Sequence, residues 1–227
     1  MSSARQITKT PWDSIALGID TYEIHSASKK TLQAALKKPG HYTVKIRPLS
    51  SKKTLHDYGF YYCDTLIVPF CPVDCFMYFQ NRAISVSDSA RISDLIRIAS
   101  DAFHGRFHRD FHVDKKLADL RYVNWLKEFY KTGQLLALKY NNELAGFFAL
   151  SKNRIRLHAM DKKFRGKGLA KYLWSAACRE LFNKGYPELE SSISVSNIAA
   201  LNLYRSLGFK FRNPLDVYHR LVVKPSS

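Results

Sequence analysis

The chain has 227 residues, of which 46% are hydrophobic and 24% are charged, a composition typical of a globular protein and not of a disordered one. Its 36 lysines and arginines outnumber its 19 aspartates and glutamates, giving a formal net charge of +17. This excess favours an anionic partner: nucleic acid, a membrane surface or an anionic small molecule. The longest apolar stretch, residues 66–70, is too short to span a bilayer, and residues 1–6 carry no apolar signal segment, so we expect a cytoplasmic protein.

Residues 1–85 predict a small α/β domain. The expected elements are helices over residues 29–36 and 50–57 and strands over residues 41–46 and 60–68. Pro69 and Pro72 should end the last strand, because proline cannot donate to a strand ladder. A loose segment is expected from there to about Ser85.

Residues 86–227 predict a second, larger α/β domain. The expected elements are helices over residues 87–99 and 115–130, strands over 135–140, 144–150 and 154–160, a helix over 169–183, a strand over 191–195, a helix over 199–207 and strands within 210–222. The pair Asn141-Asn142 predicts a hairpin turn between the first two of these strands. The order indicates a mixed sheet flanked by helices.

No metal site is expected. The sequence contains four cysteines, Cys63, Cys71, Cys75 and Cys178. They are too few for a disulfide scaffold and are expected to be reduced thiols. Cys71 and Cys75 are spaced like half of a metal site, but no second cysteine pair follows. His104, His108 and His112 are spaced as ligands on one helix would be, but the intervening Gly105 disfavours a regular helix there.

The segment from residue 154 to residue 174 carries the clearest chemistry. A strand runs into a loop with Gly166 and Gly168 and then directly into a helix. Glycines allow a close backbone approach, and a helix N-terminus offers free N–H groups and a partial positive charge, so the loop predicts a phosphate site. Eight basic and one acidic side chain lie between residues 152 and 171, which concentrates much of the net charge here.

Two motifs resemble the signature of the GNAT superfamily of N-acetyltransferases. The first is Arg165-x-x-Gly168-x-Ala170, similar to that family's pyrophosphate-binding motif. The second follows about thirty residues later and consists of Asn197, Ala200, Leu203, Tyr204, Gly208 and Phe209. The resemblance covers about residues 86–222. It implies a GNAT fold, with a mostly antiparallel mixed sheet, and acetyl-CoA as cosubstrate.

The resemblance also implies roles for particular residues. It implies that the strand over residues 191–195 splays from the preceding strand and that the pantetheine arm of CoA lies in the opening between them. It also implies that a backbone N–H of His158-Ala159-Met160 polarises the thioester carbonyl. Tyr204 would protonate the thiolate, and His158 or a chain of waters would serve as the base. The implied acetyl-CoA-binding residues are His158, Ala159, Met160, Arg165, Gly166, Lys167, Gly168, Leu169, Ala170, Asn197 and Tyr204.

The acceptor is suggested by a second, looser resemblance. Trp12-Asp13-Ser14, the segment 55–65 and the run Arg106-Phe107-His108-Arg109-Asp110 resemble the dTDP-fucosamine N-acetyltransferase family. That family acetylates the amino group of a dTDP-4-amino-4,6-dideoxy sugar, so a nucleotide-linked amino sugar is expected here. Arg106 and His108 are the expected substrate-binding residues. Ile15-Ala16-Leu17 departs from that family's pattern, which leaves local packing or substrate contacts there open.

Two alternatives stay open. The enzyme could acetylate another amine, such as an amino acid, a polyamine, an antibiotic or a protein. The chain could instead be a non-catalytic nucleic-acid-binding protein with the same fold, although its aromatic residues fall at core-spaced positions and nucleic acid is not the expected partner. A homodimer is an open expectation.

Overall fold

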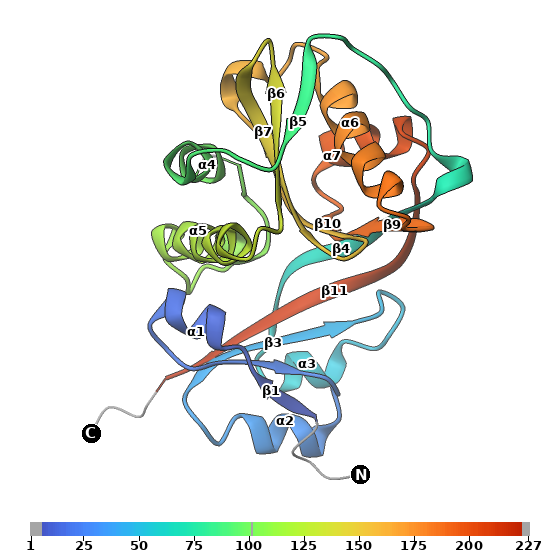
Figure 1. Cartoon of the computed structure of the whole chain (residues 1–227). Coiled ribbons are helices and arrows are strands. Elements are labelled where there is room, and N and C mark those ends of the chain that lie inside the picture. The colour runs from blue at the N-terminus through green and yellow to red at the C-terminus, as the bar shows by residue number, and fades with distance from the viewer. Residues whose placement is uncertain (1–5, 101, 224–227) are drawn as a thin grey trace. The chain divides into compact units, whose positions relative to one another are not determined.

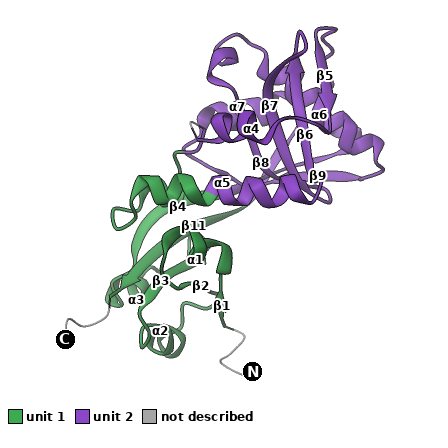
Figure 2. Ribbon diagram, turned by 60° about the vertical axis from the view of Figure 1, so that its left-hand side comes forward, with its two compact units in different colours: residues 1–66, 104–121, 213–227 green, residues 67–103, 122–212 purple. Residues whose placement is uncertain are grey.

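A computed structural model of the protein describes residues 6–100 and 102–223 (Figure 1). The chain divides into two units (Figure 2). Unit 1 comprises residues 1–66, 104–121 and 213–227, and unit 2 comprises residues 67–103 and 122–212. The expected boundary between residues 85 and 86 lies within unit 2 of this division, and residues 104–121 and 213–227 group with unit 1. Whether residues 1–85 fold on their own stays a prediction.

Unit 1 is a small sheet with short helices. Its elements are β1 (Ile7–Lys9), α1 (Pro11–Leu17), β2 (Thr21–Ile24), α2 (Lys29–Ala35), β3 (Gly40–Ile46), α3 (Lys53–Asp57) and the 3-10 helix η3 (Arg106–Arg109). The strand order is β1-β2-β3-β11, followed by β4, with β2 and β3 parallel. β4 (Tyr61–Pro72), α5 (Lys115–Lys131) and β11 (Lys210–Val222) each contribute residues to both units. Ser28 caps α2 by accepting from the Thr31 N–H, which sets Leu32 into the core.

Unit 2 contains the larger sheet. Its further elements are η2 (Val73–Cys75), β5 (Ile84–Ser87), α4 (Ile92–Ala99), β6 (Leu135–Tyr140), β7 (Glu143–Ser151), β8 (Arg154–Met160), η4 (Lys162–Phe164), α6 (Ala170–Asn183), β9 (Glu188–Ser191), β10 (Ile193–Ser194) and α7 (Ile198–Ser206). The strand order is β4-β9-β8-β7-β6-β5, and only β8 and β9 are parallel within it. The expected mixed, mostly antiparallel sheet is confirmed.

Helices cover both faces of this sheet because its strands alternate. On β7, Phe147 packs with α4 and α5, whereas Phe148 packs on the opposite face with α6 and α7. Both phenylalanines are fully buried. The face that carries Phe148 is the one on which the candidate site is built.

Three local expectations are wrong. The strand does not end at Pro69 but continues as β4 to Pro72, where residues 70–72 pair with β9. β5 forms where a loose segment was expected, because it pairs along its whole length with β6. The next helix therefore begins at Ile92, not at Ser87. No helix in the described part of the chain is long and apolar enough to cross a membrane.

Candidate active site

The site begins where two parallel strands part. β8 and β9 pair only at Arg154–Glu190 and Ile155–Ser191. β8 then continues to Met160, while the segment that follows β9 leaves β8 and pairs with β4 as β10. The second half of β8 consequently has no strand partner on this side within the described sheet.

The backbone of β8 is directed into this opening by a bulge. The register with β7 shifts between Ala149 and Leu150, which leaves Arg156 of β8 as the extra residue. The Asp161 N–H donates to Ala145 O at 2.8 Å, so residue 161 faces β7. Because a strand alternates, the N–H groups of His158 and Met160 point away from β7 into the opening.

His158 and Tyr204 come together beside this opening. The ring of His158 lies 5.6 Å from that of Tyr204 and 5.3 Å from that of Trp174, measured between centroids. Strand alternation had left the direction of the His158 ring undecided from the sequence, and the structure directs it toward Tyr204. Trp174, on α6, was not singled out by the sequence, where it reads as an ordinary apolar residue of an amphipathic helix.

Both titratable groups keep their neutral forms near pH 7. Burial lowers the pKa of His158 to about 4, because the imidazolium would lose its hydration. Burial also raises the pKa of Tyr204 well above its usual range. The Tyr204 hydroxyl and the Trp174 indole N–H are buried and have no well-formed hydrogen bond with the described residues. The Ser191 and Trp174 side chains act on the pKa of Tyr204 through weak hydrogen bonds, so the hydroxyl and the indole N–H lie together on one side of the opening.

The loop after β8 leads into α6 with its backbone N–H groups available. Gly166 and Gly168 have φ values of 75° and 69°, in the left-handed region that glycine adopts readily. Within the described chain, no hydrogen bond is formed by the N–H groups of residues 166–169. Leu169 precedes the helix without a side-chain cap, so the first turn of α6 is open to an anion.

The charges of this loop are only partly neutralised. Lys163 forms an ion pair with Glu143 at 2.6 Å, and Arg165 donates from Nε to Met160 O at 2.8 Å. Lys162 and Lys167 are exposed and form no ion pair with any described residue. The loop therefore presents uncompensated positive charge beside unpartnered N–H groups, as a phosphate site requires.

The Asn197 side chain has a structural role as a helix cap. Its side-chain oxygen accepts from the Ala200 N–H at 3.0 Å and caps α7, the helix that carries Tyr204. Asn197 is otherwise exposed. The cap fixes where α7 starts and hence where Tyr204 lies, two turns into the helix.

The expected substrate-binding residues belong to unit 1. The Arg106 guanidinium stacks over the Phe107 ring at 4.6 Å, and His108 Nε2 lies 2.7 Å from Asp119 Oδ1. Arg106 also has a φ of 48°, which is uncommon for a residue with a side chain. η3 covers only residues 106–109, so the histidines at 104, 108 and 112 do not share a regular helix.

A buried cluster in unit 1 was missed by the sequence reasoning. Asp110 Oδ2 accepts from His41 Nε2 at 2.8 Å and from His219 Nδ1 at 2.7 Å, and its Oδ1 accepts from Tyr61 at 3.0 Å. These hydrogen bonds hold the pKa of Asp110 far below its usual range despite burial. Asp110 lies in the run 106–110, which the sequence analysis had singled out, so this residue could have been noticed. His41 and His219 are far from it in the sequence, and only the fold brings them into contact with Asp110.

The chain is similar to a known protein family and to several solved structures. The model of the acetyltransferase (GNAT) family matches residues 94–209, just over half of the chain. The comparison with curated protein sequences returns no match. A GCN5-related N-acetyltransferase from Sphaerobacter thermophilus has a TM-score of 0.62 at 13% identity, over 95% of this chain and 76% of its own.

Two further solved structures are similar. A conserved protein from Staphylococcus epidermidis, described as functionally unknown, has a TM-score of 0.62 at 12% identity, over 93% of this chain and 89% of its own. A GCN5-related glucosamine N-acetyltransferase region of a fungal multi-domain β-N-acetylglucosaminidase has a TM-score of 0.60 at 10% identity, over 89% of this chain and 30% of its own. At these identities the likeness concerns the fold, and it confirms the fold expected from the sequence.

Proposed function

The chain belongs to the acetyltransferase (GNAT) family and is an N-acetyltransferase, and from this premise we propose that it transfers the acetyl group of acetyl-CoA to the amino group of a nucleotide-linked amino sugar. The observation that carries the acetyl-transfer part of the proposal is a single arrangement in unit 2. A parted strand pair, an N–H-rich basic loop and a buried Tyr204 hydroxyl lie along one stretch of β8, α6 and α7. The family generally uses acetyl-CoA, and these residues fit its chemistry.

The loop from Arg165 to Ala170 is proposed to hold the CoA pyrophosphate. Its unpartnered N–H groups and the dipole of α6 would bind the phosphate oxygens, and Lys167 would add fixed charge. Arg165 is tied to the end of β8 through Met160 O, so it couples the loop to the opening. The pantetheine arm is proposed to lie where β8 leaves β9.

The thioester carbonyl is proposed to meet a main-chain N–H of β8. Of the segment 158–160, the structure leaves the N–H groups of His158 and Met160 directed into the opening, whereas Ala159 is used by β7. A fixed donor at this place would stabilise the tetrahedral oxyanion without reorganising. Removing such a donor typically slows acyl transfer by about 100-fold or more.

Proton transfer is assigned to the two neutral side chains beside the opening. Tyr204 keeps its proton at neutral pH and is proposed to give it to the leaving thiolate. His158 is unprotonated at neutral pH and is proposed to take the amine proton, directly or through water. If His158→Gln leaves both kcat and the pH dependence of the rate unchanged, His158 is not the base.

The acceptor proposal has two supports. The first is the resemblance of the motifs in unit 1 to an amino-sugar acetyltransferase family, with Arg106 and His108 as the proposed substrate-binding residues. The second is that the fold of this chain is shared with a region described as a glucosamine N-acetyltransferase. A homodimer and a cytoplasmic location are part of the same proposal.

The test is an acetylation assay that follows thiol release from acetyl-CoA. The panel contains a dTDP-4-amino-4,6-dideoxyhexose, glucosamine, spermidine and a mixture of free amino acids, with acetyl-CoA alone as the control. Preferred turnover of the nucleotide sugar supports the proposal. Turnover of a simple amine without the nucleotide sugar would overturn the acceptor and leave the acetyltransferase in place.

A further inference from the structure

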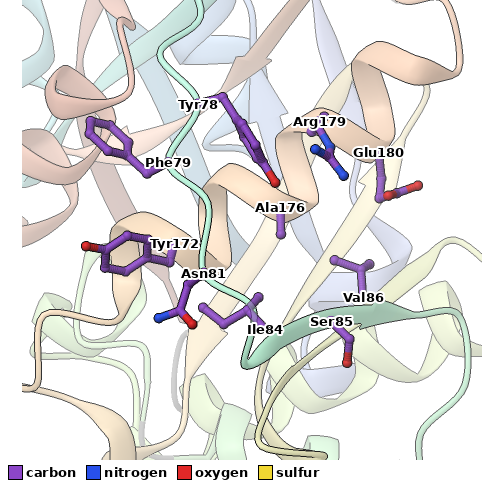
Figure 3. Close-up of a pocket in the computed structure, with 10 residues that line it drawn as sticks. All are labelled: Tyr78, Phe79, Asn81, Ile84, Ser85, Val86, Tyr172, Ala176, Arg179 and Glu180. Carbon is purple, nitrogen blue, oxygen red and sulfur yellow. The ribbon is translucent and has the colours of Figure 1, made fainter.

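A pocket lies in unit 2, between α6 and β5 (Figure 3). Its volume is about 170 Å³, and its walls come from the segment before β5, from β5 itself and from α6. Ligand pockets for drug-sized molecules usually have roughly 300–1,000 Å³, so a ligand of this pocket has to be small.

This pocket is separate from the candidate active site. On α6 the side chains of Tyr172, Ala176 and Arg179 fall on one face and line the pocket. Trp174 and Cys178 fall on the opposite, buried face, where Trp174 meets His158. The helix thus stands between the two, and a ligand in the pocket would not reach the acetyl-transfer residues.

Two opposite charges, Arg179 and Glu180, border the pocket. The Arg179 guanidinium stacks over the Tyr78 ring at 4.5 Å, which holds its planar fork in place (Figure 3). Glu180, the next residue, also lines the pocket. Neither side chain forms an ion pair or a hydrogen bond with any residue that the structure describes. A ligand that carries both a carboxylate and an ammonium group would satisfy both.

The remaining wall mixes aliphatic and polar groups and includes an unused main-chain edge. Ile84, Val86 and Ala176 contribute the aliphatic groups, and Asn81 and Ser85 contribute polar ones. The Asn141 N–H donates to Ala83 O at 2.8 Å, so residues 83, 85 and 87 face β6, and the N–H and C=O of Val86 point to the outer edge of β5. No strand covers that edge in the described sheet.

We propose that this pocket binds a free α-amino acid with an aliphatic side chain. The carboxylate would pair with Arg179, the ammonium group with Glu180, and the side chain would lie against Ile84 and Val86. The size of the pocket excludes a peptide longer than one or two residues from its interior. The inference does not depend on the acceptor proposed above, because the two sites use different faces of α6.

The test is titration calorimetry of the full chain with three matched probes. L-leucine carries both charges, 4-methylpentanoate lacks the ammonium group, and 3-methylbutylamine lacks the carboxylate. Leucine should bind, and each analogue should bind at least about tenfold more weakly, because a charged hydrogen bond is lost. The proposal fails if leucine gives no binding heat up to about 10 mM, or if either analogue binds as well as leucine.

Variants locate the binding. Arg179→Gln and Glu180→Gln should each weaken leucine binding by about tenfold. Arg205→Gln, an exposed arginine of α7 that does not line the pocket, should leave it unchanged. All three positions lie at the surface, and thermal unfolding of each variant verifies that it folds. If leucine binds but Arg179→Gln and Glu180→Gln bind it equally well, leucine occupies another site, such as the acceptor site, and the pocket proposal is wrong.

Discussion

Replacing Tyr204 with phenylalanine should separate stability from catalysis. The Tyr204 side chain is fully buried, and its hydroxyl lacks a well-formed hydrogen bond with the described residues. A buried polar group in that state costs about 1–3 kcal/mol. The small void left by one oxygen offsets part of the gain, so Tyr204→Phe should stabilise the protein by about 1 kcal/mol.

The same substitution should slow the reaction. If Tyr204 donates the proton to the leaving thiolate, its loss should lower kcat by about 100-fold or more. A residue kept only for packing predicts the opposite, with unchanged kcat. The variant should therefore be the more stable and the less active protein, a combination that loss of structure cannot produce.

Two measurements on one preparation decide this. Thermal unfolding should show a rise in Tm of about 2–4 °C, the shift expected per kcal/mol in a chain of this size. Thiol release at saturating acetyl-CoA gives kcat. Tyr186→Phe, at a partly buried tyrosine packed against the same core, is the matched control and should change neither. Full kcat in Tyr204→Phe would refute the assignment, and a fall in Tm would refute the reasoning on the hydroxyl.

Three further predictions concern the loop and the buried cluster. Lys167→Gln should raise KM for acetyl-CoA several-fold at low salt and less at high salt, with kcat unchanged. Lys184→Gln, the control, should have no effect. Equal KM values for Lys167→Gln and the parent would exclude Lys167 from the phosphate site. Gly168→Ala should lower the free energy of unfolding by about 1–2 kcal/mol, because its φ of 69° strains any residue with a side chain. The new methyl group meets nothing within 4 Å, so no steric clash adds to this cost. The substitution should also raise KM for acetyl-CoA. Gly185→Ala, with φ of 87° and equally open surroundings, should cost the same in urea unfolding but leave KM unchanged. Asp110→Asn should destabilise the protein by about 3 kcal/mol near pH 7, because it leaves buried imidazole donors poorly paired. Since the folded-state pKa of Asp110 is lowered, its stabilisation is present above the unfolded pKa of about 4 and is lost as the pH falls, so the variant should show a flatter loss of stability between about pH 5 and pH 2.

The sequence determined the features that depend on a few neighbouring residues. Gly166, Gly168 and the following apolar periodicity predicted a loop and a helix, and the structure has α6 there. Asn141-Asn142 predicted a hairpin, and both residues adopt positive φ values. Such features are local because backbone conformation and helix periodicity are properties of short segments. The same locality made Tyr204 recognisable as part of a motif.

Only the tertiary structure decided which segments meet. β4 continues past Pro69 and pairs with β9 at residues 70–72, and β5 forms because β6 offers it an edge. The direction of the His158 ring depended on a bulge opposite β7, and Asp110 acquired its partners from β3 and β11. Pairing and burial of this kind depend on residues far apart in the chain. A local sequence pattern therefore indicates which reactive groups are present, whereas the fold decides which of them share a site.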